Sequence, residues 1–298
     1  MINGIKILRR IIQEDFRGVL NMTTTILNDF IEKGMLGKSD TTIKTYAHAL
    51  QQFEKWLEGA GTDLEGYGRS DVQQYINYLA SRKKSAATIN KLFNAIKTFS
   101  RWLGKKEITE DIRVVKQQSI LQQAPKALTK AERCRLIRDI DRSGNRRNFA
   151  IVMLALNTGI RLSELVALDR SDIEISDRKG MLTVRSGKGN KARIIPLNAE
   201  TRRALTRYLE ERTDQEEALF ISNRYQRISP RMVQTMVEQQ GFNFHALRHT
   251  FITELVRSGV DISIIQSMTG HSSADMLLRY SMPSEEDKRM TVERLFTE

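Results

Sequence analysis

The apolar residues of this chain recur at helical spacing in two blocks, and a stretch without that period lies between them. In the first block, amphipathic segments begin near Ser39, Ser70 and Ala86 behind residues that commonly cap helices. The period fades over residues 105–127, which we interpret as a linker. Because 298 residues can enclose two cores, the pattern predicts two mainly α domains, the first an all-α domain over residues 22–104.

The second block contains one change of period. Residues 181–185 and 192–197 have the pattern of strands around the glycine-rich sequence SGKGNK, which predicts a β-hairpin, and residues 173–175 add a third strand. The remainder has helical spacing. We therefore expect a mostly α domain with a small antiparallel sheet over residues 128–283, followed by a C-terminal helix or tail over residues 284–298.

The chain is strongly basic, with a formal net charge of +12 at pH 7 and a pI near 9.8. Nucleic acid is the leading partner class, because lysine and arginine release counterions from phosphate polymers; a basic chain can also be merely soluble or bind acidic surfaces without specificity. The candidate contacts with a DNA backbone, each equally an ordinary solvated side chain, are Lys44, Lys91, Lys97 and Arg101 in the first block and Lys191 and Arg193 in the second.

Signals of secretion and of membrane insertion are weak. The chain has one cysteine, Cys134, and lacks an uncharged apolar run of the roughly 18 residues that a spanning helix needs. Residues 1–21 mix basic, apolar and acidic residues without a cleavage site, so we expect an N-terminal extension rather than a signal peptide. We expect a protein of the prokaryotic cytoplasm with no membrane partner.

An arginine interrupts the apolar sequence NTGIRLSELVAL at residues 157–168. Arg161 is either one half of a buried ion pair with Glu164, three residues further on, or a ligand for an anion. Glu164 can orient the guanidinium in both cases. The local pattern alone leaves the two interpretations open.

Three of the four histidines fall between residues 245 and 271. His245, Arg248 and His249 share one face of an expected helix. The spacing of His245 and His249 also suits zinc, but Ala246 stands where a general-base glutamate would follow, and Arg248 would repel a cation. We therefore expect no metal, and we interpret His249 as a hydrogen-bonded histidine of the core.

Three further residues complete a chemical set with the arginines. Lys188 lies at the expected hairpin tip, His271 follows Gly270, and Tyr280 comes nine residues later. Two arginines can hold one phosphate through planar bidentate donors, a tyrosine can attack a phosphodiester once its proton is removed, and a lysine can protonate the leaving oxygen. Together these residues have what phosphoryl transfer to a protein nucleophile needs.

The motifs TGIRLSEL, SGKGNKARIIPL, HALRHTFIT and TGHSSADMLLRY, in this order, resemble the catalytic-domain signatures of the tyrosine recombinases of the lambda-integrase and Xer type. The likeness covers residues 128–283, and the helices of residues 22–103 resemble the SAM-like core-binding domain of that family. The resemblance implies the fold of the DNA breaking-rejoining enzymes and the activity of a site-specific DNA recombinase.

Carried over residue by residue, the resemblance implies that Tyr280 attacks the scissile phosphate and forms a 3′-phosphotyrosyl bond. Arg161 and Arg248 would clamp that phosphate. The remaining implied roles are His271 as a third donor to the phosphate, His245 as the general base, Lys188 as the general acid with Lys191 as its rival, and Glu164 as a supporting residue.

The resemblance also implies cofactors and partners. Since the phosphotyrosine conserves the energy of the broken bond, neither ATP nor a metal is needed, and no cofactor is expected. The implied partners are duplex DNA with a specific recombination site, further copies of the chain as a homotetramer with a dimer on each site, and, in some systems, accessory proteins. Strand exchange would pass through a Holliday junction, and the C-terminal tail is expected to dock on a neighbouring protomer.

Some positions depart from the family pattern. Thr269 stands where leucine is usual, Leu277 where threonine is frequent, and SMP follows Tyr280 where a Thr-His pair is common. We expect these departures to leave the catalytic roles untouched, and they favour an enzyme that integrates, excises or resolves a mobile element. The alternative functions are a type IB DNA topoisomerase and a catalytically idle DNA-binding protein.

Overall fold

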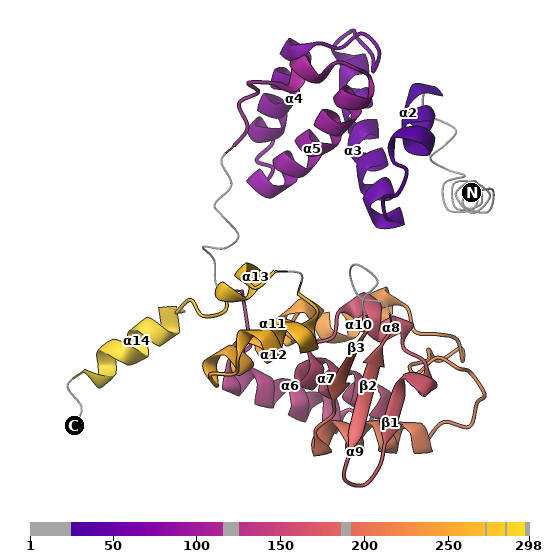
Figure 1. Cartoon of the computed structure of the whole chain (residues 1–298), viewed down its shortest axis with the longest axis vertical. Coiled ribbons are helices and arrows are strands. Elements are labelled where there is room, and N and C mark those ends of the chain that lie inside the picture. The colour runs from indigo at the N-terminus through magenta and orange to yellow at the C-terminus, as the bar shows by residue number, and fades with distance from the viewer. Residues whose placement is uncertain (1–24, 116–124, 186–191, 272, 284, 296–298) are drawn as a thin grey trace. The chain divides into compact units, whose positions relative to one another are not determined.

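The computed structural model of the chain describes residues 25–115, 125–185, 192–271, 273–283 and 285–295. It divides into two compact units, residues 1–118 and 119–298 (Figure 1). The expected N-terminal extension, residues 1–21, lies outside the described residues.

Three long helices form most of the first unit. They are α3 (Asp40–Gly59), α4 (Arg69–Ser81) and α5 (Ala86–Trp102), which confirms the three amphipathic helices expected from the sequence. The side chains of Ser39 and Ser85 accept hydrogen bonds from backbone amides three residues on, and these caps fix where α3 and α5 begin.

A further segment, which the sequence pattern did not predict, packs against these helices. The short helix α2 (Thr25–Asp29) continues into a π-helical turn, η2 (Phe30–Gly34). Phe30 is fully buried and meets Phe99 of α5 edge to face, with ring centroids 5.1 Å apart. The core of the first unit therefore extends to residues before the first amphipathic helix.

The expected linker begins later than the sequence suggested. A 3₁₀ turn, η3 (Lys106–Thr109), follows α5, and Ile108, Ile112 and Val114 pack against the core of the first unit. The backbone amide of Arg113 donates to Gln73 Oε1 over 2.8 Å. These apolar contacts attach residues 105–115 to the first unit, and residues 116–124 of the expected linker lie outside the described part of the chain.

The second unit is built around one buried helix. Helix α7 (Arg146–Thr158) is buried at every position from 150 to 156, and it contacts α6 (Lys130–Arg142), α9 (Ala199–Glu210) and α11 (Phe244–Arg257). The other described helical elements of this unit are α8 (Leu162–Ala167), η5 (Arg170–Asp172), α10 (Pro230–Glu238), α12 (Ile262–Thr269), α13 (Asp275–Leu278) and α14 (Glu285–Arg294).

A small antiparallel sheet lies within this helical unit, as expected. Its strands are β1 (Ile173–Ile175), β2 (Gly180–Val184) and β3 (Arg193–Pro196), in the order β1-β2-β3. Leu182 pairs with Ile173 on one side and with Ile195 on the other, and Leu182 and Ile195 are fully buried. One face of the sheet therefore joins the core, and helix α12 contacts the outer strand β3 (Figure 1).

Apolar side chains in and directly after the C-terminal helix α14 are exposed to solvent. Val292 and Leu295 are each 63% exposed. None of the described helices is both long enough and apolar enough to cross a membrane.

A glycine at the end of α7 allows two helices to approach closely. Gly159 has φ +59°, and a Cβ added to it would lie 2.5 Å from Cδ1 of Phe251 on α11. Its carbonyl oxygen accepts a hydrogen bond from Arg248, also on α11. The turn thus depends on a residue that tolerates a left-handed conformation and has no side chain.

We predict that Gly159→Ala destabilises the second unit by about 1 to 3 kcal/mol beyond the cost of the backbone conformation, because the new methyl group overlaps Phe251. Gly144→Ala is the matched control, since Gly144 has φ +69° with open space around it and should cost only about 1 kcal/mol. Chemical denaturation measures both variants. Equal losses of stability would contradict the proposed overlap.

Candidate functional site

Arg161 stands at the start of α8 with its side chain partly open to solvent. Its backbone amide donates to Oε2 of Glu164 over 2.9 Å, and its Nη1 donates to Oε1 over 2.8 Å. Its Nη2 donates to the carbonyl oxygen of Gly270 over 2.7 Å. The side chain of Arg161 is 24% exposed, whereas that of Glu164 is 3% exposed. The guanidinium is therefore held rigidly while part of it stays accessible.

Arg193 completes this ion pair from strand β3. Its Nη1 and Nη2 donate to the two carboxylate oxygens of Glu164 over 3.0 and 2.7 Å, and its Nε donates to the carbonyl oxygen of Met268 over 2.8 Å. Glu164 thus accepts four hydrogen bonds, which matches the capacity of a carboxylate. We expected Arg193 to contact a DNA backbone. Instead its side chain is 7% exposed and neutralises a buried carboxylate.

Arg248 brings a third guanidinium into the same site. Its side chain, on α11, donates to the carbonyl oxygens of Gly159 and of Thr269, the latter over 2.9 Å. Arg248 is 5% exposed, and burial together with the charge of Arg161 lowers its pKa to about 10. One carboxylate faces three guanidinium groups here, so the cluster carries excess positive charge and attracts an anion.

His271 lies beside Arg248 and is held by Thr269. The hydroxyl of Thr269 donates to the carbonyl oxygen of Ile265 over 2.6 Å, so it accepts from Nδ1 of His271, which lies 2.7 Å away. Burial and nearby arginines lower the pKa of His271 to about 4, and its Nε2 lies 3.4 Å from Nη2 of Arg248. In the neutral ring Nε2 accepts, so donation to a phosphate requires protonation of the imidazole.

This arrangement corrects one expectation. We expected the departure from the family pattern at Thr269 to leave the catalytic roles untouched. Its hydroxyl instead fixes which nitrogen of His271 carries the proton.

Tyr280 follows the short helix α13 and is buried. It is 5% exposed and packs with Ile252, Ile265 and Leu277 in a small apolar cluster. Its hydroxyl lies 2.8 Å from Nδ1 of His249 on α11, and burial raises the pKa of Tyr280. The structure thus brings the tyrosine into the neighbourhood of the arginine cluster, where Arg248 acts on it electrostatically.

His249 is the site residue that the sequence did not identify. We interpreted it as a core histidine, but it is half-buried and its hydrogen-bond partner is the candidate nucleophile. One sequence feature could have identified His249 as a site residue. It directly follows Arg248 and lies one helical turn from His245.

The remaining candidates are one exposed histidine and two lysines that the structure does not describe. His245 is exposed on α11 and makes no side-chain hydrogen bond with another described residue. Lys188 and Lys191 lie outside the described residues. Within the described ranges, no group of three histidine, cysteine or acidic side chains is placed to bind a metal ion.

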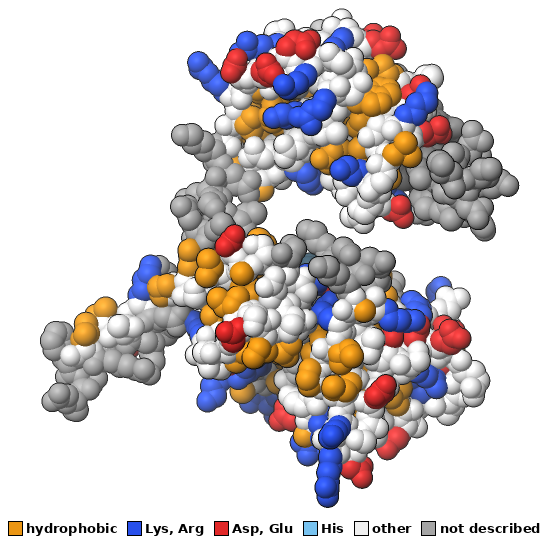
Figure 2. Space-filling model, in the orientation of Figure 1, with side chains coloured by type: hydrophobic (Ala, Val, Ile, Leu, Met, Phe, Trp, Pro, Cys, Tyr) orange, Lys and Arg blue, Asp and Glu red, His pale blue; other side chains and the backbone are white. Residues whose placement is uncertain are grey.

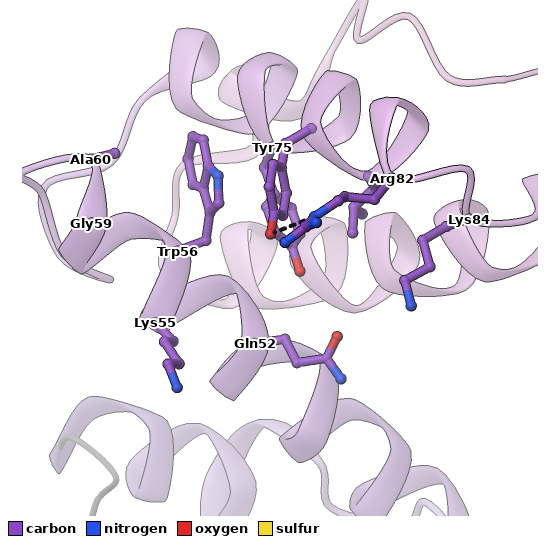
Figure 3. A pocket seen from close by; sticks show the side chains of 10 residues that line it. Gln52, Lys55, Trp56, Gly59, Ala60, Tyr75, Arg82 and Lys84 are labelled. Carbon is purple, nitrogen blue, oxygen red and sulfur yellow. Dashed lines mark hydrogen bonds between the residues drawn. The ribbon is translucent and has the colours of Figure 1, made fainter.

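The first unit carries a basic, aromatic hollow between α3 and α4, with a volume of about 790 Å³. Trp56, Tyr75 and Arg82 line it together (Figure 3). The ring centroids of Trp56 and Tyr75 are 5.4 Å apart, and the guanidinium of Arg82 stands 5.6 Å from the ring centre of Tyr78. Lys55 and Lys84 also line this hollow. Aromatic rings can stack on the bases of a nucleic acid, and neighbouring cations can bind its phosphates, so this hollow is suited to binding nucleic acid.

The lysines and arginine predicted to contact DNA in this unit lie outside the hollow. They are exposed on α3 and α5, namely Lys44, Lys91, Lys97 and Arg101. Figure 2 shows lysine and arginine side chains dispersed among acidic ones over the visible surface of both units.

The Glu164 ion pair makes stability dependent on pH. Burial alone would raise the pKa of Glu164, but hydrogen bonds from Arg193 and Arg161 outweigh it and hold the pKa at about 2, below its ordinary 4.5. Because the folded-state pKa is depressed, the stabilisation is fully present above about pH 4.5 and is lost as the pH falls towards 2.

We predict that Glu164→Gln lowers the unfolding free energy at pH 7 by about 3 to 5 kcal/mol, since the buried guanidinium of Arg193 and the partly buried one of Arg161 lose their counter-charge. It should also flatten the loss of stability between pH 4.5 and 2. Glu174→Gln, an exposed substitution on β1, is the control and should change stability by less than about 0.5 kcal/mol. Denaturation curves over this pH range test both, and equal behaviour would contradict the assignment.

Comparison with known proteins agrees with this geometry. Residues 126–287 match the model of the phage integrase family, and residues 26–110 match the N-terminal SAM-like domain of phage integrases. The crystal structure of the XerH site-specific recombinase bound to difH substrate has the same fold, with a TM-score of 0.67 and 20% identity, over 94% of this chain and 86% of that one.

Two relatives are similar over most of their length. The chain is 34% identical to tyrosine recombinase XerA of Pyrococcus furiosus, over 87% of this chain and 89% of that protein. It is 28% identical to the TnP I resolvase of Bacillus thuringiensis, over 83% of this chain and 91% of that protein. With a family model matched over more than half of its length, this chain belongs to the phage integrase family and is a tyrosine recombinase.

Proposed function

We propose that this recombinase cleaves and rejoins DNA at a specific site through a 3′-phosphotyrosyl intermediate. The observation that carries the proposal is the excess positive charge of Arg161, Arg193 and Arg248 over Glu164, beside the hydroxyl-bearing side chain of Tyr280. A phosphodiester supplies the anion that such a cluster attracts, and a tyrosine supplies the nucleophile.

In this mechanism the oxygen of Tyr280 attacks the scissile phosphorus, and the 5′-oxygen of the DNA leaves. Arg161 and Arg248 bind the non-bridging oxygens and stabilise the charge that develops on them. Protonated His271 gives a third hydrogen bond. The family resemblance assigns the general base to His245 and the general acid to Lys188, and both roles stay predictions.

The chemistry needs no external energy source. The phosphotyrosyl bond replaces one phosphodiester and is later attacked by a 5′-hydroxyl, so the number of ester bonds is unchanged. The arginines neutralise the phosphate charge without a metal ion.

DNA and further copies of the chain are the proposed partners. The net charge of +12 and the exposed cations of α3, α5 and the aromatic hollow support binding to a DNA backbone. A dimer on each site and a tetramer on paired sites would exchange strands through a Holliday junction. The exposed Val292 of α14 and Leu295 directly after it suit docking on a neighbouring protomer.

We further propose a role in the movement or resolution of a mobile element. The similarity to a resolvase of Bacillus thuringiensis supports it, as do the departures from the family pattern around Tyr280. A type IB topoisomerase would form the same bond but without preference for a site, and an idle DNA-binding protein would form no bond.

We predict that the protein forms a covalent adduct with DNA in buffer containing EDTA and that Tyr280→Phe abolishes the adduct while retaining DNA affinity, because only the attacking oxygen is removed. Sequencing the DNA of adducts trapped on sheared host DNA would identify the recombination site. Nicked substrates for the cleavage assay can then be made with that site. Tyr225→Phe, at an exposed turn, is the matched control and keeps full activity. An adduct in Tyr280→Phe would refute the nucleophile, and adducts spread evenly over the DNA would favour the topoisomerase.

We also predict that Arg161→Ala slows cleavage about 100- to 1,000-fold, the loss typical when one donor to a developing oxyanion is removed. The fold should survive, since Arg193 still neutralises Glu164. Arg146→Ala removes an arginine from an exposed ion pair with Glu211 and serves as control. Intact cleavage combined with lost stability would make Arg161 a structural ion-pair residue instead.

A further inference from the structure

The hydroxyl of Thr269 has two hydrogen-bond partners and only one proton. Thr269 is the last residue of α12 and is fully buried. Its Oγ1 lies 2.6 Å from the carbonyl oxygen of Ile265, which can only accept, and 2.7 Å from Nδ1 of His271. The hydroxyl proton is used towards Ile265, so Nδ1 must carry a proton and donate it to the hydroxyl oxygen.

This contact lies within one turn of the chain, residues 265–271, and does not involve the nucleophile. The carbonyl oxygen of His271 accepts from Nε2 of Gln266 over 3.0 Å, which holds the backbone of the histidine. Arg248 donates to the carbonyl oxygen of Thr269 over 2.9 Å and so holds the same turn from α11. The orientation of the imidazole is therefore set within this turn.

The other ring nitrogen faces the arginine cluster, since Nε2 of His271 lies 3.4 Å from Nη2 of Arg248. Burial first, and then nearby charges, lower the pKa of His271 to about 4. In the free protein at neutral pH the ring is consequently neutral, with its proton on Nδ1 and a lone pair on Nε2. The groups that face it are Arg248 and His249 on α11, Arg161 at the start of α8, Arg193 on β3 with Glu164 bound to both of the last two, and the ring of Tyr280 at 6.4 Å.

A phosphate in the cluster would meet a different group in each protonation state of His271. A lone pair on Nε2 repels a phosphate oxygen, whereas an imidazolium donates a hydrogen bond to it and adds positive charge. The other neutral form, with its proton on Nε2, would leave the buried Nδ1 facing a hydroxyl oxygen that has no proton to offer. The phosphate also offsets the arginine charges and so raises the pKa of His271.

We propose that Thr269 is a positioning residue that makes His271 a hydrogen-bond donor to the scissile phosphate only when the imidazole is protonated. The threonine hydroxyl holds the single proton of the neutral ring on Nδ1, away from the phosphate. Cleavage therefore has this third hydrogen bond at low pH and loses it as the pH rises through the pKa of His271 in the DNA complex. The proposal rests on the recombinase mechanism above and adds to it a dependence on pH.

Thr269→Val tests the proposal because it removes the hydroxyl and keeps the shape of the side chain. The neutral imidazole can then carry its proton on Nε2 and donate to the phosphate. We expect the ratio of single-turnover adduct formation, Thr269→Val over the unaltered protein, to rise with pH from about pH 5 to 9. It should start at or below one, since the imidazolium of the variant lacks an acceptor for Nδ1. It should level off at about 100-fold, the effect typical of one donor to a developing oxyanion.

Two control variants separate the position of the proton from a loss of packing. Thr269→Ser keeps the hydroxyl and should follow the pH profile of the unaltered protein. Thr158→Val is the matched control, because Thr158 is also fully buried and its Oγ1 donates over 2.6 Å to the carbonyl oxygen of Leu154, four residues earlier on α7. Any effect of Thr158→Val should be the same at every pH. A ratio for Thr269→Val that does not change with pH, or a serine variant that behaves like the valine one, would overturn the proposal.

Nitrogen NMR of the DNA-free protein with isotopically labelled histidine tests the position of the proton directly. At neutral pH, Nδ1 of His271 should give the signal of a protonated nitrogen and Nε2 that of an unprotonated one. The two signals should move towards each other in Thr269→Val, and their loss in His271→Gln assigns them. A proton on Nε2 in the unaltered protein would contradict the proposal, even if Thr269→Val does not fold.

The two proposals fail in different ways. Absence of an adduct with the unaltered protein would refute the recombinase mechanism and, with it, the role of Thr269. An adduct whose rate has the same pH dependence in the unaltered protein and in Thr269→Val would refute only the role of Thr269.

Discussion

The carboxylate of Glu164 is the interaction on which the site depends. Its four hydrogen bonds join the start of α8 to strand β3, and the two arginines that it binds reach on to the backbone near residues 268–270. A buried carboxylate is unfavourable alone, and buried guanidinium groups are equally so. The carboxylate and the guanidinium groups therefore compensate each other's burial. Because the arginines outnumber the one carboxylate, the cluster keeps a net positive charge that solvent screens only in part. An anion of the size of a phosphate then becomes the natural complement.

The nucleophile is controlled by a different principle. Apolar neighbours bury the hydroxyl of Tyr280 and raise its pKa, and Nδ1 of His249 lies 2.8 Å from that hydroxyl. In the proposed mechanism the tyrosine reacts once a phosphate occupies the arginine cluster.

Local patterns predicted the helices and the hairpin because their determinants are close in sequence. Caps such as Ser39 and the alternation around residues 181–197 lie within a few residues of the structures they specify. The roles of Arg193 and His249 could not be predicted in this way. Their partners lie 29 and 31 residues away, and the contacts exist only once the sheet and α13 have packed. The boundary at residue 105 was misplaced for the same reason, since the apolar residues after η3 have no regular period.

The carbonyl oxygens of Gly159, Thr269 and Gly270 accept hydrogen bonds from Arg248 and Arg161. Backbone atoms are present whichever side chain a position carries. The path of the backbone, rather than residue identity, therefore determines this part of the geometry. A leucine at position 269 would accordingly still accept the hydrogen bond from Arg248 through its carbonyl oxygen. Such a change would remove the hydroxyl that fixes the proton on Nδ1 of His271, while the backbone hydrogen bonds to Arg248 and Arg161 would stay in place.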